Sequence, residues 1–385
     1  MAQNEVRNIP MVLYVAKRFE TNIAACVHRA AIEEMAGKEQ VFVVNLRMDD
    51  PAERRERYVA YGKYKNKFQR IVQWLEGNSM YLSNAVIADI CNIIKDNKIE
   101  TVFIEDSIFG SLVKAIKEKY PDVYVITFFH DIAPDLYVQW ARRGGIINKI
   151  ECRLEIRQER INQKYSDVDL VFNKRDAALY QKFYGTEPDG CIPIATPVPE
   201  IDAEKASAGV AGSVKELLFV GSKYFPNILG IRWFYENVLP ELPESIAVKI
   251  VGRGTEFLRE EFADPSIQVI GTVDSVDPYY RNADIVFAPL FDGGGMKCKS
   301  VEALSYGKIF VGTSESLYGF WEQMDEELRF KYVYLCDTQV EWVKTMRKLC
   351  SEKELHKYNE PVFRLFLNKF SDEATKKQFL SFFEK

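Results

Sequence analysis

The chain has 385 residues, of which 47% are hydrophobic and 28% are charged, and its 51 basic and 56 acidic side chains give a net charge of −5. This length exceeds the usual size of a single core, so we expect two domains. The mildly negative charge excludes a global field that would hold nucleic acid, so we expect no nucleic-acid partner.

The cysteines and histidines point to a reducing compartment and away from zinc. The seven cysteines are scattered without a C-x-x-C pair, which is typical of reduced thiols in a cytosol. The three histidines, His28, His130 and His356, lie far apart in the sequence, so we expect no metal site. The N-terminal residues do not have the pattern of a signal peptide, and no apolar run reaches 18 residues. We therefore expect a cytoplasmic protein.

In the first half, strand-like apolar runs alternate with helical patterns, which predicts a doubly wound parallel sheet covered by helices. We assign residues 1–196 to this Rossmann-like domain. The predicted strands are Val12–Ala16, Val41–Leu46, Thr101–Glu105, Val123–Phe129, Leu170–Asn173 and Cys191–Ala195.

The second half repeats the alternation, after a stretch rich in small residues and proline (197–213) that we interpret as an interdomain linker. We assign residues 214–360 to a second Rossmann-like domain, and we expect residues 361–385 to form a helix that packs back on the first domain. The predicted strands are Leu217–Gly221, Val248–Gly252, Ile267–Val273, Ile285–Leu290, Ile309–Thr313 and Val333–Cys336.

The segment 288–307 joins a strand end, three consecutive glycines, two lysines and a glutamate. Its helix is predicted from Lys297 to Tyr306, so the glycines lie at a strand-to-helix turn, where the backbone can approach a ligand and unpaired amides attract an anion. This pattern favours a site for a phosphorylated, hydroxyl-bearing ligand. The alternatives are a flexible turn and a surface ion pair between Lys299 and Glu302.

Motifs through most of the second half resemble the retaining glycosyltransferases of family 4 (glycosyl transferases group 1). They are Phe219-Val-Gly-Ser222, Pro226-Asn-Ile-Leu-Gly-Ile-Arg-Trp-Phe234, Val251-Gly-Arg-Gly254, Ile270-Gly-Thr-Val273, Tyr279-Tyr-Arg-Asn-Ala-Asp-Ile-Val-Phe-Ala-Pro289, the glycine segment and Gly307-Lys-Ile-Phe-Val-Gly-Thr313. The resemblance implies the α/β GT-B fold, with two Rossmann-like parallel-sheet domains facing a cleft. It also implies transfer of a sugar from a nucleotide-sugar to a glycan, lipid-linked or protein acceptor, with retention of configuration, in polysaccharide or glycoconjugate biosynthesis.

By this resemblance the donor binds in the C-terminal domain. Glu302 is expected to accept hydrogen bonds from the ribose, Lys299 to face the diphosphate, and Thr272 and Val273 to hold the base. Lys223 and Lys297 are second phosphate contacts or, alternatively, solvated lysines. The complete set of expected donor-binding residues is Gly221, Lys223, Asn227, Arg253, Thr272, Val273, Gly293, Gly294, Gly295, Met296, Lys297, Lys299 and Glu302.

In the first half, Thr127-Phe-Phe-His-Asp-Ile-Ala-Pro134 places His130 at a strand end, where the family often presents a histidine to the sugar. We take His130, Lys299 and Glu302 as the candidate catalytic residues; the alternative for His130 is a neutral core histidine. Asp49-Asp50 does not qualify as a metal site, so we expect no metal, and no cofactor beyond the nucleotide-sugar co-substrate.

The segment Arg54 to Trp74 holds seven basic residues, one acidic residue and five aromatic residues. This composition suits an anionic membrane surface or a phospholipid-linked acceptor, and the alternative is an exposed helix or a packed loop. The sequence leaves open whether the protein associates with the inner membrane face and whether it forms a homo-oligomer.

Three positions depart from the family pattern. Gly294 stands where a second glutamate is common, Ser222 stands where an arginine is frequent, and Lys17-Arg-Phe-Glu-Thr-Asn22 replaces a glycine-rich loop. These departures keep two alternatives in view, a catalytically silent GT-B-like scaffold and a GT-B sugar-nucleotide epimerase.

Overall fold

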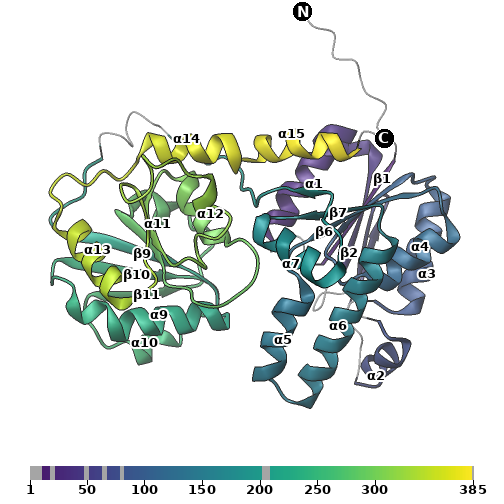
Figure 1. Ribbon diagram of the computed structural model, residues 1–385, viewed down its shortest axis with the longest axis horizontal. Coiled ribbons are helices and arrows are strands. Elements are labelled where there is room, and N and C mark those ends of the chain that lie inside the picture. Colours follow the sequence, from purple (N-terminus) through teal and green to yellow (C-terminus); the bar gives the residue numbers. More distant parts are fainter. Residues whose placement is uncertain are drawn as a thin grey trace, which may run out of the picture. The chain divides into compact units, whose positions relative to one another are not determined.

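The computed structural model of the chain (Figure 1) describes residues 11–17, 22–46, 52–62, 67–78, 82–201 and 209–383. The predicted motifs at Asp49-Asp50 and within the loop 18–21 lie outside these residues. The chain divides into two compact units. The N-terminal unit comprises Met1–Pro193 with Thr375–Lys385, and the C-terminal unit comprises Ile194–Ala374.

The N-terminal unit is built on a sheet that has eight strands among the described residues, in the order β3-β4-β2-β1-β5-β6-β7-β8. All neighbours pair in parallel except β3 and β4. The strands are β1 (Val12–Lys17), β2 (Val41–Leu46), β3 (Glu53–Arg55), β4 (Tyr58–Tyr61), β5 (Thr101–Glu105), β6 (Tyr124–Phe129), β7 (Val168–Val171) and β8 (Gly190–Cys191).

Helices cover both faces of this sheet, so its central strands are buried along almost their whole length. The helices are α1 (Ile23–Ala36), α2 (Lys67–Glu76), α3 (Asn84–Asp96), α4 (Gly110–Lys119), α5 (Ala133–Arg143), α6 (Ile146–Tyr165), α7 (Lys174–Tyr184) and the last helix, α15 (Asp372–Phe383). From Thr375 on, α15 belongs to the N-terminal unit, where Phe379 is buried against His28 and Phe103.

In the described part of the C-terminal unit, the sheet is parallel throughout and has six strands in the order β11-β10-β9-β12-β13-β14. This is the strand order of a doubly wound fold, in which ligands bind beyond the carboxyl ends of the strands where the order reverses, here between β9 and β12. The strands are β9 (Lys215–Val220), β10 (Ile246–Val251), β11 (Ile267–Gly271), β12 (Ile285–Ala288), β13 (Ile309–Gly312) and β14 (Val333–Leu335).

The helices of the C-terminal unit include one that begins at the glycine segment, α12. The helices are α9 (Phe225–Asn237), α10 (Leu258–Glu261), α11 (Asp277–Asn282), α12 (Cys298–Ser305), α13 (Gln339–Ser351) and α14 (Glu360–Lys369). Helix α9 lies so close to the end of β12 that a Cβ at Gly230 would stand 2.1 Å from the carbonyl oxygen of Pro289. The glycine is therefore required for this packing.

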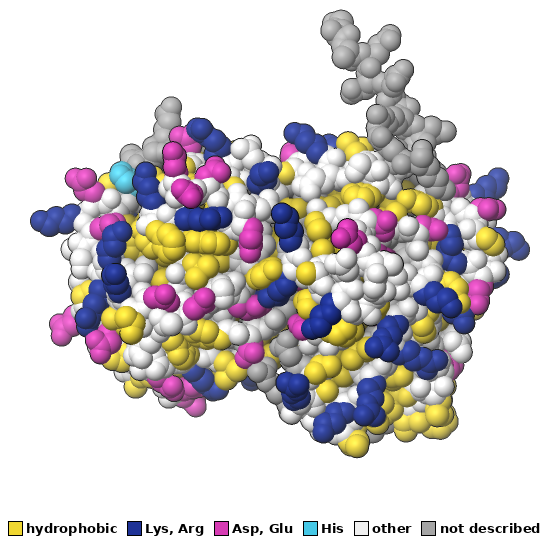
Figure 2. Space-filling model, viewed as in Figure 1, with side chains coloured by type: hydrophobic (Ala, Val, Ile, Leu, Met, Phe, Trp, Pro, Cys, Tyr) yellow, Lys and Arg dark blue, Asp and Glu magenta, His cyan; other side chains and the backbone are white. Residues whose placement is uncertain are grey.

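The predicted class of two parallel-sheet α/β domains is confirmed, and most predicted strands match within two residues. One expectation was wrong in detail, because the run Cys191–Ala195 contributes only its first residue to a strand. The basic segment from Arg54 forms part of the hairpin β3–β4 and then α2. Charged side chains of both signs are spread over the face shown in Figure 2.

Candidate functional site

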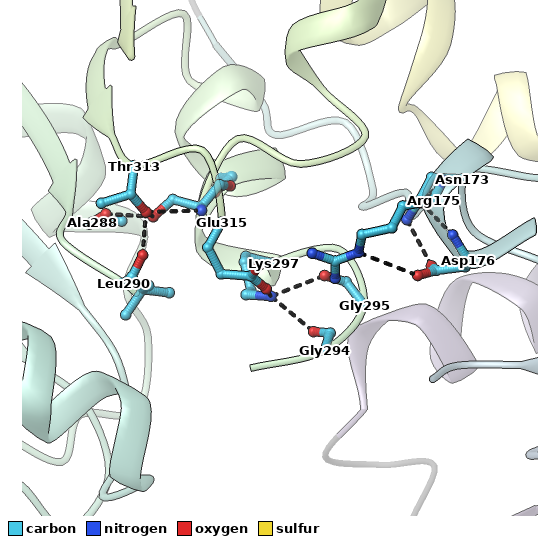
Figure 3. Close-up of polar contacts among 12 residues, drawn as sticks. Asn173, Arg175, Asp176, Ala288, Leu290, Gly294, Gly295, Lys297, Thr313 and Glu315 are labelled. Atoms are coloured by element: carbon cyan, nitrogen blue, oxygen red, sulfur yellow. Dashed lines mark hydrogen bonds and ion pairs between the residues drawn. The ribbon is translucent and has the colours of Figure 1, made fainter. Parts of the chain in front are cut away.

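The glycine segment forms a closed loop between β12 and α12. Gly293 and Gly295 have φ angles of 127° and 59°, which other residues rarely adopt. The Lys297 amine folds back onto this loop and donates to the carbonyls of Gly294 (2.8 Å) and Gly295 (2.9 Å), as Figure 3 shows. It also pairs with Glu315 at 2.6 Å. Lys297 is therefore engaged in holding the loop rather than a solvated lysine.

Buried hydroxyls fix the segment that carries Glu315. Thr313 donates to the carbonyl of Leu290 (Figure 3), and Ser316 donates to the carbonyl of Ala288. These two bonds connect the loop after β13 to the end of β12. The Ser300 hydroxyl on α12 donates to the carbonyl of Ser316 at 2.6 Å. These bonds place the glycine loop, the start of α12 and Glu315 in one rigid arrangement.

Lys299 is a buried cation at the start of α12. Its amine donates to the side-chain oxygen of Asn227 on α9 and lies 4.7 Å from the centre of the Phe219 ring. A Cβ at Gly221 would stand 3.1 Å from that amine. Burial, with the nearby charge of Lys297, lowers the pKa of Lys299 to about 7. The alternative of a surface ion pair with Glu302 is therefore wrong for Lys299.

Glu302 lies one turn further along α12 and is held by a tyrosine. The buried Tyr280 hydroxyl donates to Glu302 Oε2 at 2.8 Å, and the Tyr280 ring stacks on Tyr306 with centres 5.0 Å apart. Burial raises the pKa of Glu302 to about 7, although the hydrogen bond from Tyr280 and the charge of Lys299 oppose this rise. The second carboxylate oxygen stays available to accept from a ligand.

Loops after β9, β10 and β11 carry the remaining predicted residues and are linked by hydrogen bonds. The Lys223 amide donates to the carbonyl of Arg253 at 2.8 Å, and the Gly254 amide donates to Thr272 Oγ1 at 3.2 Å. The Thr272 amide donates to Glu256 at 2.7 Å. The structure thus connects three of the predicted strand ends.

Three of the predicted donor-binding residues are not freely exposed to a ligand. The Lys223 amine lies over the Phe257 ring, 4.6 Å from its centre. Val273 is only partly exposed, and Met296 is buried next to Gly319. Met296 therefore supports the loop from inside.

In the N-terminal unit, a second polar cluster lies at the carboxyl ends of β5 and β6. Glu105 ends β5 and is fully enclosed, and one of its oxygens, Oε1, contacts both His130 Nε2 (2.5 Å) and His28 Nδ1 (2.7 Å). The other oxygen lies 2.9 Å from the Tyr14 hydroxyl. His130 is the predicted residue; the sequence interpretation missed Glu105, Tyr14 and His28.

The cluster has an unusual charge balance. Burial would raise the pKa of Glu105, but the charge of His28 and the hydrogen bonds from His130 and His28 lower it instead. Burial likewise disfavours a charged His130, but the hydrogen bond and charge of Glu105 outweigh it and raise the pKa of His130. The alternative of a neutral core histidine is therefore disfavoured for His130.

Two of the three histidines meet a carboxylate in space, although they are far apart in sequence. Among the described residues, His28, Glu105 and His130 are the one group of three or more His, Cys, Asp or Glu side chains whose potential metal-binding atoms all lie within 4.8 Å of one another. These donor types suit zinc. However, both ring nitrogens lie at hydrogen-bond distance from the same carboxylate oxygen, which favours a hydrogen-bonded arrangement.

The segment Asn173-Lys-Arg-Asp176 follows β7 and caps α7 in the N-terminal unit. The Asn173 side-chain oxygen accepts from the amides of Arg175 (2.9 Å) and Asp176 (3.0 Å), and its amide group donates to the Asp176 carboxylate at 2.6 Å (Figure 3). Asn173 is therefore an ordinary N-cap residue.

Residues 214–351 match the family model of the glycosyl transferases group 1. No curated protein matches the chain in sequence. Among solved structures, Anabaena HepE in complex with UDP and glucose superposes with a TM-score of 0.68 at 10% identity, covering 97% of this chain and 99% of that chain. The lipopolysaccharide glycosyltransferase WaaG superposes with a TM-score of 0.64 at 15% identity, covering 97% and 99%.

The UDP-forming α,α-trehalose-phosphate synthase from Burkholderia xenovorans gives a TM-score of 0.64 at 10% identity, covering 98% and 99% of the two chains. At such identities these likenesses show the fold. The whole chain therefore shares the GT-B fold of these structures, and its residues 214–351 are similar to the group 1 glycosyl transferases.

Proposed function

We propose that the chain transfers a sugar from a nucleotide-sugar to a hydroxyl acceptor, with retention of anomeric configuration and without a metal. The observation that carries this proposal is the buried Lys299 amine beside Asn227, one turn from Glu302 and next to the glycine loop, within the segment that matches the group 1 glycosyl transferases. A buried cation that has no carboxylate partner at contact distance among the described residues is suited to an anionic ligand.

The donor would bind along α12 and the strand-end loops. Lys299 and the amides of Gly294 and Gly295 would face the diphosphate, and Glu302 would accept from the ribose hydroxyls. Thr272 and Val273 would contact the base, and Arg253 would lie beside them. HepE, which shares the fold, was solved with UDP, so uridine is the first base to test.

During transfer, the bond between the anomeric carbon and the phosphate oxygen breaks, and its electron pair stays on the leaving diphosphate. The acceptor oxygen attacks the anomeric carbon from the same face, and its proton passes to the leaving phosphate. Lys299 and preformed amides would stabilise the growing negative charge, and losing one such group typically costs about 100-fold to 1000-fold in rate.

His130 would act in the N-terminal unit on the sugar side. Its raised pKa favours the cationic form, which donates hydrogen bonds, and Glu105 fixes its ring orientation through Nε2. We propose a cytoplasmic location and a glycan, lipid-linked or protein acceptor.

Thermal shift with UDP, GDP, ADP, CMP and dTDP tests the donor site, using wild type, Glu302→Ala and the exposed control Glu260→Ala. A ligand at about 100 times its dissociation constant stabilises the fold by about 2.7 kcal/mol. We expect one nucleotide to raise the melting temperature of wild type and the control but not of Glu302→Ala, with and without EDTA. Absence of any shift would favour the catalytically silent scaffold.

Turnover then separates the enzyme classes. Conversion of UDP-N-acetylglucosamine to its C2 epimer without an acceptor would favour the epimerase. Release of the nucleoside diphosphate that depends on an added acceptor would support the transferase, and a product with inverted configuration would contradict retention.

A further inference from the structure

Helix α2 is oriented with its apolar side toward solvent. Phe68, Ile71 and Leu75 recur at helical spacing and are exposed, with 71% of Phe68 and 82% of Leu75 accessible. The polar Gln73, in contrast, is buried. A helix that packs on a protein core normally shows the opposite arrangement, so this apolar stripe marks a surface that contacts something else.

Polar contacts fix this orientation of α2 against α6. Arg70 pairs with Glu151, and the carbonyl of Gly77 accepts from the Gln158 side chain at 2.5 Å. The two contacts are equally spaced along both segments, so α2 and the turn after it run in the same direction as the part of α6 that they contact. The apolar stripe of α2 is therefore presented next to the outer surface of α6.

Helix α6 separates its charges by sign. Of its three acidic residues, Glu155 and Glu159 are buried, and the partly exposed Glu151 is paired with Arg70. Glu159 is held by Ser107 and by the Ala133 amide. The exposed charged side chains along the helix are basic: Lys149, Arg153, Arg157, Arg160 and Lys164. In a chain with a net charge of −5, this is a local basic stripe.

The first turn of α6 continues the apolar surface. Ile146 is 77% exposed, and Ile147 and Ile150 are also exposed, as is Val138 on α5. Figure 2 shows hydrophobic and basic side chains together, with few acidic ones, over the lower part of the N-terminal unit, where α2, α5 and α6 lie in Figure 1. No helix among the described residues is long and apolar enough to cross a bilayer.

We propose that α2 and the outer face of α6 form a docking surface for an anionic phospholipid membrane. The apolar side chains would enter the boundary between headgroups and acyl chains, and the basic stripe would contact lipid phosphates. The apolar stripe and the basic stripe together favour an anionic membrane over other partners. An uncharged apolar partner would not need the basic stripe, and a nucleic acid would not need Phe68 and Leu75. Vesicle binding and nucleotide binding use different residues, so either can fail without the other.

Flotation of the full chain with vesicles tests this surface. We expect wild type to bind vesicles of phosphatidylcholine with phosphatidylglycerol more tightly than vesicles of phosphatidylcholine alone, and to be released at about 1 M salt. Phe68→Ser with Leu75→Ser should weaken binding about tenfold or more to both vesicles. Lys149→Glu with Arg153→Glu should weaken binding to the anionic vesicles by more than tenfold.

The matched controls are Val340→Ser, which is as exposed as Ile146, and Lys344→Glu, both on α13. They should bind like wild type, and all variants should show the wild-type circular dichroism spectrum because the replaced side chains are exposed. Failure of wild type to bind anionic vesicles would overturn the proposal. Equal losses in the controls, or self-association that disappears in Phe68→Ser with Leu75→Ser while vesicle binding remains, would overturn it too.

Discussion

Glu105 Oε1 lies 2.5 Å from His130 Nε2 and so joins the end of β5 to the residue that follows β6. The same oxygen contacts His28 at 2.7 Å, so a single buried carboxylate oxygen holds two imidazoles. Because the carboxylate favours the charged form of His130, the charge of the candidate catalytic histidine depends on a residue that would not touch the substrate.

Glu105→Gln should lower the pKa of His130 and destabilise the fold by about 3 kcal/mol, since one partner of a buried ion pair is lost. The raised pKa of His130 contributes stability that is complete below about pH 6.5 and disappears as the pH rises through the raised value. The lowered pKa of Glu105 contributes stability that is present above about pH 4.3 and is lost as the pH falls below that value. The free energy of unfolding in urea should therefore differ most between Glu105→Gln and wild type between about pH 4.3 and about pH 6.5.

Glu100→Gln is the control, because Glu100 is exposed directly before β5. NMR titration of the His130 ring should show a lower pKa in Glu105→Gln and an unchanged one in the control. An unchanged pKa in both would contradict the positioning role of Glu105. Binding of zinc by wild type with loss of the histidine titration would show that the cluster holds a metal.

Lys299→Met should stabilise the free protein while removing donor binding. Burial of the charged amine lowers the pKa of Lys299 to about 7, so below that pH the folded protein carries a buried cation whose replacement relieves a cost. We expect a higher melting temperature near pH 6 and no shift with the nucleotide that stabilises wild type. Lys344→Met is the exposed control, and a nucleotide shift that survives in Lys299→Met would exclude the diphosphate role.

Donor affinity of wild type should fall as the pH rises above about 7. A diphosphate binds the protonated amine, so above the pKa of Lys299 each binding event takes up a proton, and the affinity loss approaches about tenfold per pH unit. Isothermal titration calorimetry in two buffers of different ionisation enthalpy measures the proton uptake. A pH-independent dissociation constant with no proton uptake would contradict Lys299 as the phosphate contact.

Glu302→Gln should keep the fold but weaken donor binding about 10-fold to 100-fold. Glutamine still accepts from Tyr280, yet it has only one acceptor oxygen and no charge, and hydrogen bonds to charged groups contribute about 1.5–3 kcal/mol. Deoxyribose nucleotides make a matched comparison, because they lack one of the two hydroxyls. If Glu302→Gln lowered the affinity for ribose and deoxyribose nucleotides by the same factor, Glu302 would not contact the ribose hydroxyls.

Gly230→Ala should destabilise the C-terminal unit by about 1–3 kcal/mol. The added methyl group would stand 2.1 Å from the Pro289 carbonyl oxygen, so α9, which carries Asn227, would have to move away from β12. Gly212→Ala is the control, because its nearest neighbour would be 3.9 Å away. Chemical denaturation should separate the two variants, and equal midpoints would show that the packing tolerates the methyl group.

The sequence by itself determined the class of fold and the residues at the strand ends. Apolar runs of strand length followed by helical periodicity depend on local chain geometry, so strands such as Val41–Leu46 and Thr101–Glu105 were predictable to the residue. The glycine loop and α12 were predictable for the same reason, because turn and helix signals lie next to each other in the chain.

Only the tertiary structure decided which of these residues meet. The contact between Lys299 and Asn227 joins two helices, and the cluster of His28, Glu105 and His130 joins residues more than 100 positions apart at its extremes. The sequence carried one signal for Glu105, which is a carboxylate at the end of a buried strand, and the next strand along the chain ends directly before His130. The exposed apolar side of α2 carried none, because periodicity gives a helix its apolar face but not the direction in which the rest of the chain turns that face.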